Sequence, residues 1–155
     1  MSSAVKVGSV CALVIVPLVL ASCGGTNNPQ PVNAKKTIPV RGEVYIDGKP
    51  GYGVKVNFVP KSPDAANPTV SVGESGEDGK FEIGTYGTND GAPAGEYVLT
   101  FVWFDRTKID VLNREESAAD QFSGKYADPK NSKHSVTVPE DATEVEIPRI
   151  ELTTQ

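Results

Sequence analysis

The sequence is poor in the side chains that most often carry chemistry or hold metals. Its 155 residues include one histidine, one tryptophan and two cysteines. Its longest almost wholly apolar stretch, residues 7–20, contains Pro17 and is shorter than the roughly 20 residues that a membrane-spanning helix needs. Basic side chains are outnumbered, 15 against 20 acidic ones. This balance argues against nucleic acid as a partner and against an electrostatic grip on anionic lipid.

The first 22 residues have the layout of a secretory signal peptide: a short start with Lys6, the apolar stretch, and small residues around a cysteine. The sequence there, Leu20-Ala21-Ser22-Cys23, resembles the lipobox of bacterial lipoproteins. In that family a signal peptidase cuts before the cysteine, and the thiol carries a diacylglycerol. The resemblance implies an exported protein held at the bacterial cell membrane by acyl chains, such as palmitate, on Cys23. The alternative is an ordinary signal peptide with an accidental cysteine.

Cleavage at that point would also set the membrane, the size and the folding chemistry of the mature protein. Gly24 follows the cysteine where lipoproteins kept in the inner membrane commonly have aspartate, so we expect the outer membrane rather than the inner one. The mature chain would have 155 − 22 = 133 residues, enough for one domain. Because Cys11 would leave with the leader and Cys23 would be acylated, the domain must fold without a disulfide. The predicted parts are a leader (1–22), a flexible tether (23–37) and one domain (38–155).

The domain shows the period-two alternation of half-buried strands, first from Ile38 to Ile46 and then from Val54 to Phe58. Asp47-Gly48 between them favours a turn, so we expect a hairpin or meander. Further short strands are predicted at 69–73 (Val70 and Val72 on one side), 80–83 (Phe81 and Ile83 inward), 136–138 and 145–152. Pro148 places the last strand at a sheet edge.

The most apolar strand is predicted at 97–104, where both faces carry large side chains, as in a central strand. Tyr97 at its entrance suits a tyrosine corner, in which a buried phenol donates to upstream backbone. About seven short strands and little helix predict an all-β fold, a single antiparallel Greek-key β-sandwich. Residues 105–133 break the strand pattern and are predicted to form an insert, either a short helix near 107–120 or a long loop. The insert either packs against the domain or serves as the functional loop.

A resemblance to a known domain family rests on several segments in order. They are Val40-Arg41-Gly42-Glu43-Val44, Asp47-Gly48-Lys49-Pro50, Val54-Lys55-Val56-Asn57-Phe58, Asp78-Gly79-Lys80-Phe81-Glu82-Ile83 and Pro93-Ala94-Gly95-Glu96-Tyr97-Val98-Leu99. Together they resemble a carboxypeptidase regulatory-like domain of the transthyretin-like (prealbumin-like) sandwich group. The segment 124–132 is similar to one found in small planctomycete-type lipoproteins. The resemblance covers about residues 38–152 and implies an accessory module without enzymatic activity.

The sequence contains few residues that could act in catalysis or bind a metal. Hydroxyisourate hydrolases and intradiol dioxygenases, the enzymes of this sandwich group, use several histidines, whereas His134 is alone here. A zinc site of imidazole and thiolate ligands fails for the same reason. We expect His134 to be an exposed polar residue. The Asp-Gly pairs at 47–48, 78–79 and 90–91 match no calcium loop and are expected to be turns. We therefore predict no catalytic residue, no metal and no cofactor.

Aromatic side chains are the remaining candidates for ligand contact, namely Trp103, Phe104 and Tyr86. An exposed cluster of them could stack on sugars or hold a peptide. The alternative is that Trp103 and Phe104 pack beneath the 105–133 insert. Our first hypothesis is a non-enzymatic, lipid-anchored envelope domain that acts as a structural or protein-interaction module. The second is a carbohydrate-binding accessory module of the cell surface or periplasm, and the third is an enzyme.

Overall fold

The fold is all-β across the part of the chain that the computed structural model describes, residues 33–64, 69–104 and 119–154. Within those ranges no helix is long and apolar enough to cross a membrane. The strands are β1 (Thr37–Ile38), β2 (Val40–Ile46), β3 (Lys49–Pro50), β4 (Val54–Pro60), β5 (Ser71–Glu74), β6 (Lys80–Glu82), β7 (Ala92–Pro93), β8 (Gly95–Trp103), β9 (Ser135–Val138) and β10 (Val145–Leu152). Three of these ten strands have only two residues.

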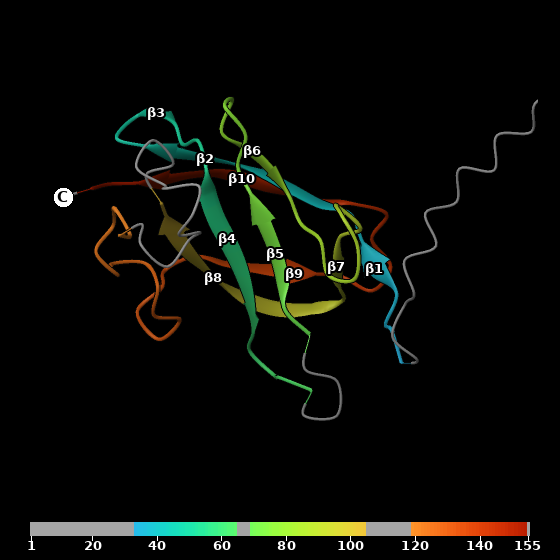
Figure 1. The fold of residues 1–155 in the computed structure, drawn as a ribbon. Coiled ribbons are helices and arrows are strands. Elements are labelled where there is room, and N and C mark those ends of the chain that lie inside the picture. The colour runs from blue at the N-terminus through green and yellow to red at the C-terminus, as the bar shows by residue number, and fades with distance from the viewer. Residues whose placement is uncertain (1–32, 65–68, 105–118, 155) are drawn as a thin grey trace, which may run out of the picture.

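Two four-stranded sheets form the two layers of the domain (Figure 1). In the first, which we call the β2 sheet, β10 and β3 flank β2, and β6 also pairs with β2. In the second, the β8 sheet, the order is β5-β4-β8-β9. A small pair, β1 with β7, lies at the end where the described chain begins. Two facing sheets are consistent with the predicted β-sandwich.

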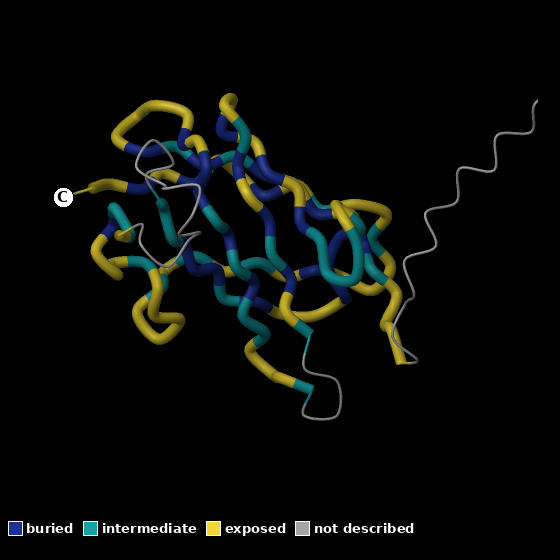
Figure 2. Tube along the Cα trace, viewed as in Figure 1, coloured by how far each residue is buried: buried dark blue, intermediate teal, exposed yellow. Residues whose placement is uncertain are grey.

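One hydrophobic core lies between the sheets, and Figure 2 shows the buried positions along the strands of both layers. The alternation read from the sequence is confirmed: Val40, Val44 and Ile46 of β2 are buried. So are Phe81 and Ile83. In the opposite sheet the buried side chains are Val54, Val56 and Phe58 of β4 and Tyr97, Leu99 and Phe101 of β8. The prediction that β8 is a central strand is also confirmed, because it pairs with both β4 and β9.

The prediction of a hairpin between residues 38–46 and 54–58 is wrong, because the two strands belong to different sheets. β2 instead pairs with the short β3 across Asp47-Gly48, where both residues have the positive φ of a tight hairpin turn, 50° and 77°. The chain then crosses to the other sheet. Ser75 holds this crossing, since its buried hydroxyl accepts from Val54 N at 2.9 Å and donates to the carbonyl of Gly51.

The last strand follows its prediction in position but not in direction. β10 is at the edge of the β2 sheet, and its register slips between Ile147 and Ile150, around Pro148. The all-antiparallel prediction is wrong here, because β10 runs parallel to β2. After β9 the chain passes from one sheet to the other through residues 139–144 and enters beside the start of β2, where Val145 N donates to Pro39 O at 2.9 Å.

Candidate functional site

The predicted lipidation site, Cys23, lies outside the described residues, as do the leader and most of the tether. The helix predicted near 107–120 falls almost wholly outside them too. Within the described ranges, no group of three or more His, Cys, Asp or Glu side chains is placed to hold a metal ion. The candidate residues that can be located are the three aromatics, His134 and the Asp-Gly pairs.

Trp103 stands at the end of β8 and is held on several sides. Its indole Nε1 donates to Tyr52 O at 3.0 Å, and its ring centroid lies 5.6 Å from that of Phe122. Its backbone N–H donates to the carboxylate of Asp120 at 3.0 Å. For Trp103, the prediction that it packs against the insert is therefore confirmed. The indole is half-buried in this arrangement.

The second half of the insert, residues 119–133, packs against the end of β8. Phe122 is 3% exposed and meets Tyr126 edge to face, with ring centroids 5.0 Å apart. Asp120 forms an isolated bridge with Phe104 and also accepts from the backbone N–H groups of Phe122 and Gly124, at 3.1 and 2.8 Å. This part of the insert is a packed excursion built around one carboxylate and an aromatic cluster.

Tyr86 lies apart from the other two aromatics, in the loop between β6 and β7 and toward the opposite end of the sheets (Figure 1). Its hydroxyl accepts from the backbone N–H of Lys35 at 3.0 Å. The three aromatic candidates therefore do not form one cluster. Tyr86 lines a groove in the described surface.

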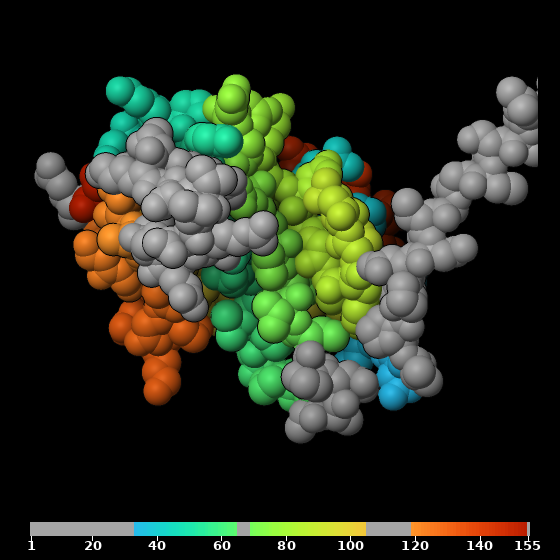
Figure 3. Space-filling model, in the orientation of Figure 1, coloured from blue at the N-terminus to red at the C-terminus, as the bar shows by residue number. Residues whose placement is uncertain are grey.

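That groove, of about 540 Å³, runs between β5 and the loop 84–89 (Figure 3, green and yellow-green). Asp90 fixes the loop, because its carboxylate accepts from the backbone N–H groups of Thr85, Tyr86 and Gly87 at 2.7, 3.1 and 3.1 Å. Val72 and Gly84 exchange two backbone hydrogen bonds of 2.9 Å, which tie the loop to β5. The groove combines apolar with polar side chains: Val70, Val72, Tyr86, Lys55, Glu74, Glu82, Thr88 and Asn89.

Two of the three Asp-Gly pairs are confirmed as turns, at 47–48 and 78–79, whereas Asp90-Gly91 follows a turn at 88–89 and leads into β7. Gly48, Gly79 and Gly91 all have positive φ, between 77° and 92°. Their aspartates serve local backbone or neighbouring hydroxyls; Asp78, for example, accepts from Lys80 N at 3.0 Å.

The strand predicted at 69–73 is shifted to 71–74, and its valines face outward. Val70 is 66% exposed, whereas Ser71 is buried. Gly73 on the inner side packs so closely on the backbone of Glu82 that a Cβ there would clash. The inner side of β5 therefore takes small residues, and valine is displaced to the surface.

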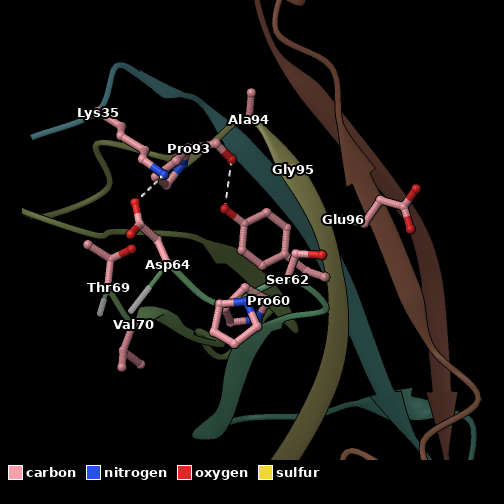
Figure 4. A pocket seen from close by; sticks show the side chains of 12 residues that line it. Lys35, Pro60, Ser62, Asp64, Thr69, Val70, Pro93, Ala94, Gly95 and Glu96 are labelled. Carbon is pink, nitrogen blue, oxygen red and sulfur yellow. Dashed lines mark hydrogen bonds and ion pairs between the residues drawn. The ribbon is translucent and has the colours of Figure 1, made fainter. Parts of the chain in front are cut away.

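A second cavity, also about 540 Å³, was not foreseen from the sequence (Figure 4). It lies beside the tyrosine corner, which is confirmed: Tyr97 Oη donates to Pro93 O at 2.8 Å, and the residue is 6% exposed. Burial, and secondarily the nearby Tyr86, raise the pKa of the Tyr97 phenol. Lys35 and Asp64 form an ion pair of 2.9 Å across the cavity. Its other walls include Pro60, Pro63 and Pro93.

His134 is not the exposed residue that we predicted, because it is half-buried at the start of β9. Its ring meets Phe101 edge to face at 5.4 Å, and burial lowers the pKa of the imidazole. The sequence neighbours Lys133 and Ser135 suggested exposure, but the insert brings the ring back onto β8. It is a packing residue in this structure.

Comparisons with known proteins add little to this picture. The sequence matches no family model, and no curated protein is significantly similar to it. One solved structure with a partial likeness is a 9R-lipoxygenase from Cyanothece PCC8801, at 15% identity and a TM-score of 0.39. The match covers 76% of this chain but spans only 16% of the lipoxygenase chain. A likeness at this level carries no argument about fold or activity.

Proposed function

We propose that this protein is a lipid-anchored module of the bacterial cell envelope, with a structural or protein-interaction role and no enzymatic activity. Cys23 would carry the acyl chains, residues 23–37 would form the tether, and residues 38–155 would form the working domain. The leader and lipobox-like sequence carry the anchoring part of this proposal. The non-enzymatic part is supported by the described domain, because its polar side chains hydrogen-bond to the backbone or pack in the fold.

Serine, aspartate and histidine side chains, which often act in catalysis, make structural contacts in this domain. Ser75 bonds the backbone at the crossing between the sheets, and Asp90 and Asp120 each accept from three backbone N–H groups. His134 packs on Phe101. A general base has to reach its substrate's proton with a free lone pair, and these groups are committed to the fold. This use of Ser75, Asp90, Asp120 and His134 is the observation that favours an interaction module.

We also assign the domain to the carboxypeptidase regulatory-like, transthyretin-like group of Greek-key sandwiches with about seven strands. Seven of the ten strands have three or more residues, which supports this count: β2, β4, β5, β6, β8, β9 and β10. In this view the two-residue strands β1, β3 and β7 are local turns and links. The tether would enter at the β1 end, and β3 with the C-terminus would lie at the far end from the membrane (Figure 1).

The anchor is tested by replacing the cysteine in the full-length chain. Cys23→Ala should abolish labelling by radioactive palmitate and leave an uncleaved or soluble protein. Cys11→Ala is the matched control, because it also removes a cysteine but leaves the lipobox-like sequence intact, and it should label like the wild type. Labelling and processing that survive in Cys23→Ala would overturn the lipoprotein assignment.

A carbohydrate-binding role is the second candidate, and the groove beside Tyr86 is what favours it. An aromatic ring among hydroxyl, amide and charged groups offers both stacking and hydrogen bonds to a sugar. A glycan array with the wild type and with Tyr86→Ala tests it, and Tyr52→Ala, which removes an aromatic that is 49% exposed, is the control. Saturable binding that only Tyr86→Ala removes would favour this candidate over the first.

A further inference from the structure

The edges of the two sheets differ in how well they are protected against pairing with another strand. An edge strand presents unpaired N–H and C=O groups, and proteins usually block it with proline, charge, a bulge or a covering segment. β10 has such devices, since it includes Pro148 and the register slip, and Glu146, Arg149 and Glu151 on it are exposed. β5 is closed by its two hydrogen bonds to Gly84.

β9 has none of these protections within its own length. It is the last strand of the β8 sheet, and no described strand lies beyond it. Its residues are Ser135-Val136-Thr137-Val138, which are uncharged and mostly β-branched, the composition that favours strand pairing. Ser135 and Thr137 are exposed. Charge and proline occur only at its two ends, in Lys133 and in Pro139-Glu140-Asp141.

The register shows which backbone groups of β9 are free to bind a further strand. Leu99 N donates to His134 O at 2.9 Å, and the antiparallel register pairs Tyr97 with Val136. Hydrogen-bonded pairs alternate along an antiparallel ladder, so residues 134, 136 and 138 direct their backbone groups to β8. The N–H and C=O groups of Ser135 and Thr137 therefore point away from the sheet, and no described residue bonds to them.

We propose that β9 is a docking edge for β9 of a second copy of this chain, paired antiparallel about a two-fold axis at Val136. In this register Ser135 of each copy lies opposite Thr137 of the other. Their outward groups then form four backbone hydrogen bonds, because both residues are in hydrogen-bonded positions. The two β8 sheets become one continuous sheet of eight strands. The outer faces of the two sheets lie on the same side of the joined sheet, because odd-numbered residues of β9 pair with odd-numbered ones and even-numbered with even-numbered ones.

The charges at the two ends of β9 identify a second copy, and not an unrelated strand, as the occupant. The strand is preceded by the basic Lys133 and followed by the acidic Glu140 and Asp141. Antiparallel pairing of two copies brings the basic end of each beside the acidic end of the other, twice by symmetry. Parallel pairing would bring like charges together. The edge is self-complementary in both hydrogen bonding and charge.

The proposal is tested by disulfide cross-linking in the full-length chain, in the cells that express it. Val136→Cys places the two thiols at a pair that faces across the two-fold axis, about 4.5 Å apart at Cα, within disulfide reach. Although Val136 is half-buried and Glu151 is exposed, mild oxidation should give a dimer band at least about tenfold stronger than Glu151→Cys on the protected edge β10, because that edge has no partner in register. The wild-type chain is the background control, because any dimer band that it gives must come from Cys11 or Cys23.

A charge pair at the neighbouring positions tests the register in the Val136→Cys background. Ser135→Lys with Thr137→Lys places like charges opposite each other and should reduce the dimer band to that of Glu151→Cys. Ser135→Glu with Thr137→Lys changes the same two exposed positions but places opposite charges together, and it should keep the band. Equal yields for the two double variants, no dimer from Val136→Cys, or a link to a different protein would each overturn the proposal.

Discussion

The outer faces of the two sheets differ in chemistry although they cover the same core. The face of the β2 sheet carries a network of charges: Arg41 pairs with Glu144 at 2.9 Å, and Arg149 lies 3.5 Å from Glu43 and 4.0 Å from the ring centre of Tyr45. The outer face of the β8 sheet carries short uncharged side chains along its middle, and charges only toward the strand ends, at Lys55, Glu74 and Glu96. The short side chains are Asn57, Val59, Val72, Val98, Val102 and the buried Thr100.

The difference separates a face adapted to water from one adapted to contact. Exposed ion pairs contribute little to stability, and charged side chains generally disfavour pairing with another protein. The β8 sheet has its charges at the strand ends, where Lys61 pairs with Glu96 at 3.2 Å, and it includes the open edge β9 and borders the groove beside Tyr86. Stability should therefore depend on the side chains that both sheets turn inward, and partner binding should depend on the β8 sheet.

The largest effect should come from the inner face of the β8 sheet. Phe101→Ala removes a fully buried ring that also contacts Tyr126 and His134, and we expect it to lower the free energy of unfolding by about 3–5 kcal/mol. Val102→Ala, one residue along on the outer face, should cost about 1 kcal/mol or less. Urea unfolding followed by tryptophan fluorescence measures both. Similar losses for the two variants would contradict the assigned orientation of β8.

The next effect should appear where the chain passes between the sheets. Ser75→Ala removes the hydroxyl that serves both Val54 N and Gly51 O in a buried position. Two backbone groups would lose their partner, so the free energy of unfolding should fall by about 1–3 kcal/mol. Ser62→Ala, at an exposed serine, is the control and should change little. A neutral Ser75→Ala would show that the crossing is held by other contacts.

A smaller effect is expected on the charged face. Arg149→Ala removes the contacts with Glu43 and Tyr45, and we expect a loss of about 1 kcal/mol or less. The loss should shrink at high salt, because exposed charges are screened. Chemical denaturation with urea at low and high ionic strength tests this. A salt-independent loss of several kcal/mol would mean that the β2 sheet depends on its outer face as much as on its core.

The smallest effect should be a dependence of stability on pH that arises from His134. Burial lowers the pKa of its imidazole, so the unfolded chain, with a pKa of about 6.5, binds a proton more readily than the folded one. The contribution is fully present above the unfolded pKa and is lost as the pH falls below it. Urea midpoints at pH 7.5 and 5.5 should therefore fall more in the wild type than in His134→Gln. Equal shifts in both would contradict a buried imidazole.

Much of the local structure could be predicted from the sequence because it depends on short-range patterns. Alternation located β2 and β4, an apolar run located β8, two Asp-Gly pairs marked turns, and Pro148 marked an edge strand. The tyrosine corner at Tyr97 was predictable from its spacing to Gly95. Each of these follows from backbone geometry and burial within a few residues.

The pairing of strands could not be predicted in the same way. Whether β4 returns beside β2 or crosses to the other sheet depends on contacts such as Ser75 with Val54, which lie 21 residues apart. The parallel direction of β10 depends on where the 139–144 link crosses between sheets. The burial of His134 depends on the insert folding back onto Phe101. Alternation shows which residues of a strand face the core, but it does not show which other strand pairs with it.

For this protein, the sequence by itself determined the all-β class, the inward positions of the core and the expectation of an anchor at Cys23. Only the tertiary structure decided that Trp103 is a packing residue, that Tyr86 borders a groove, and that β9 is the open edge. The physical reason is that the alternation of buried and exposed residues in a strand depends on residues that are close together in the sequence. Exposure of an aromatic ring or of a strand edge depends on which distant segment happens to cover it.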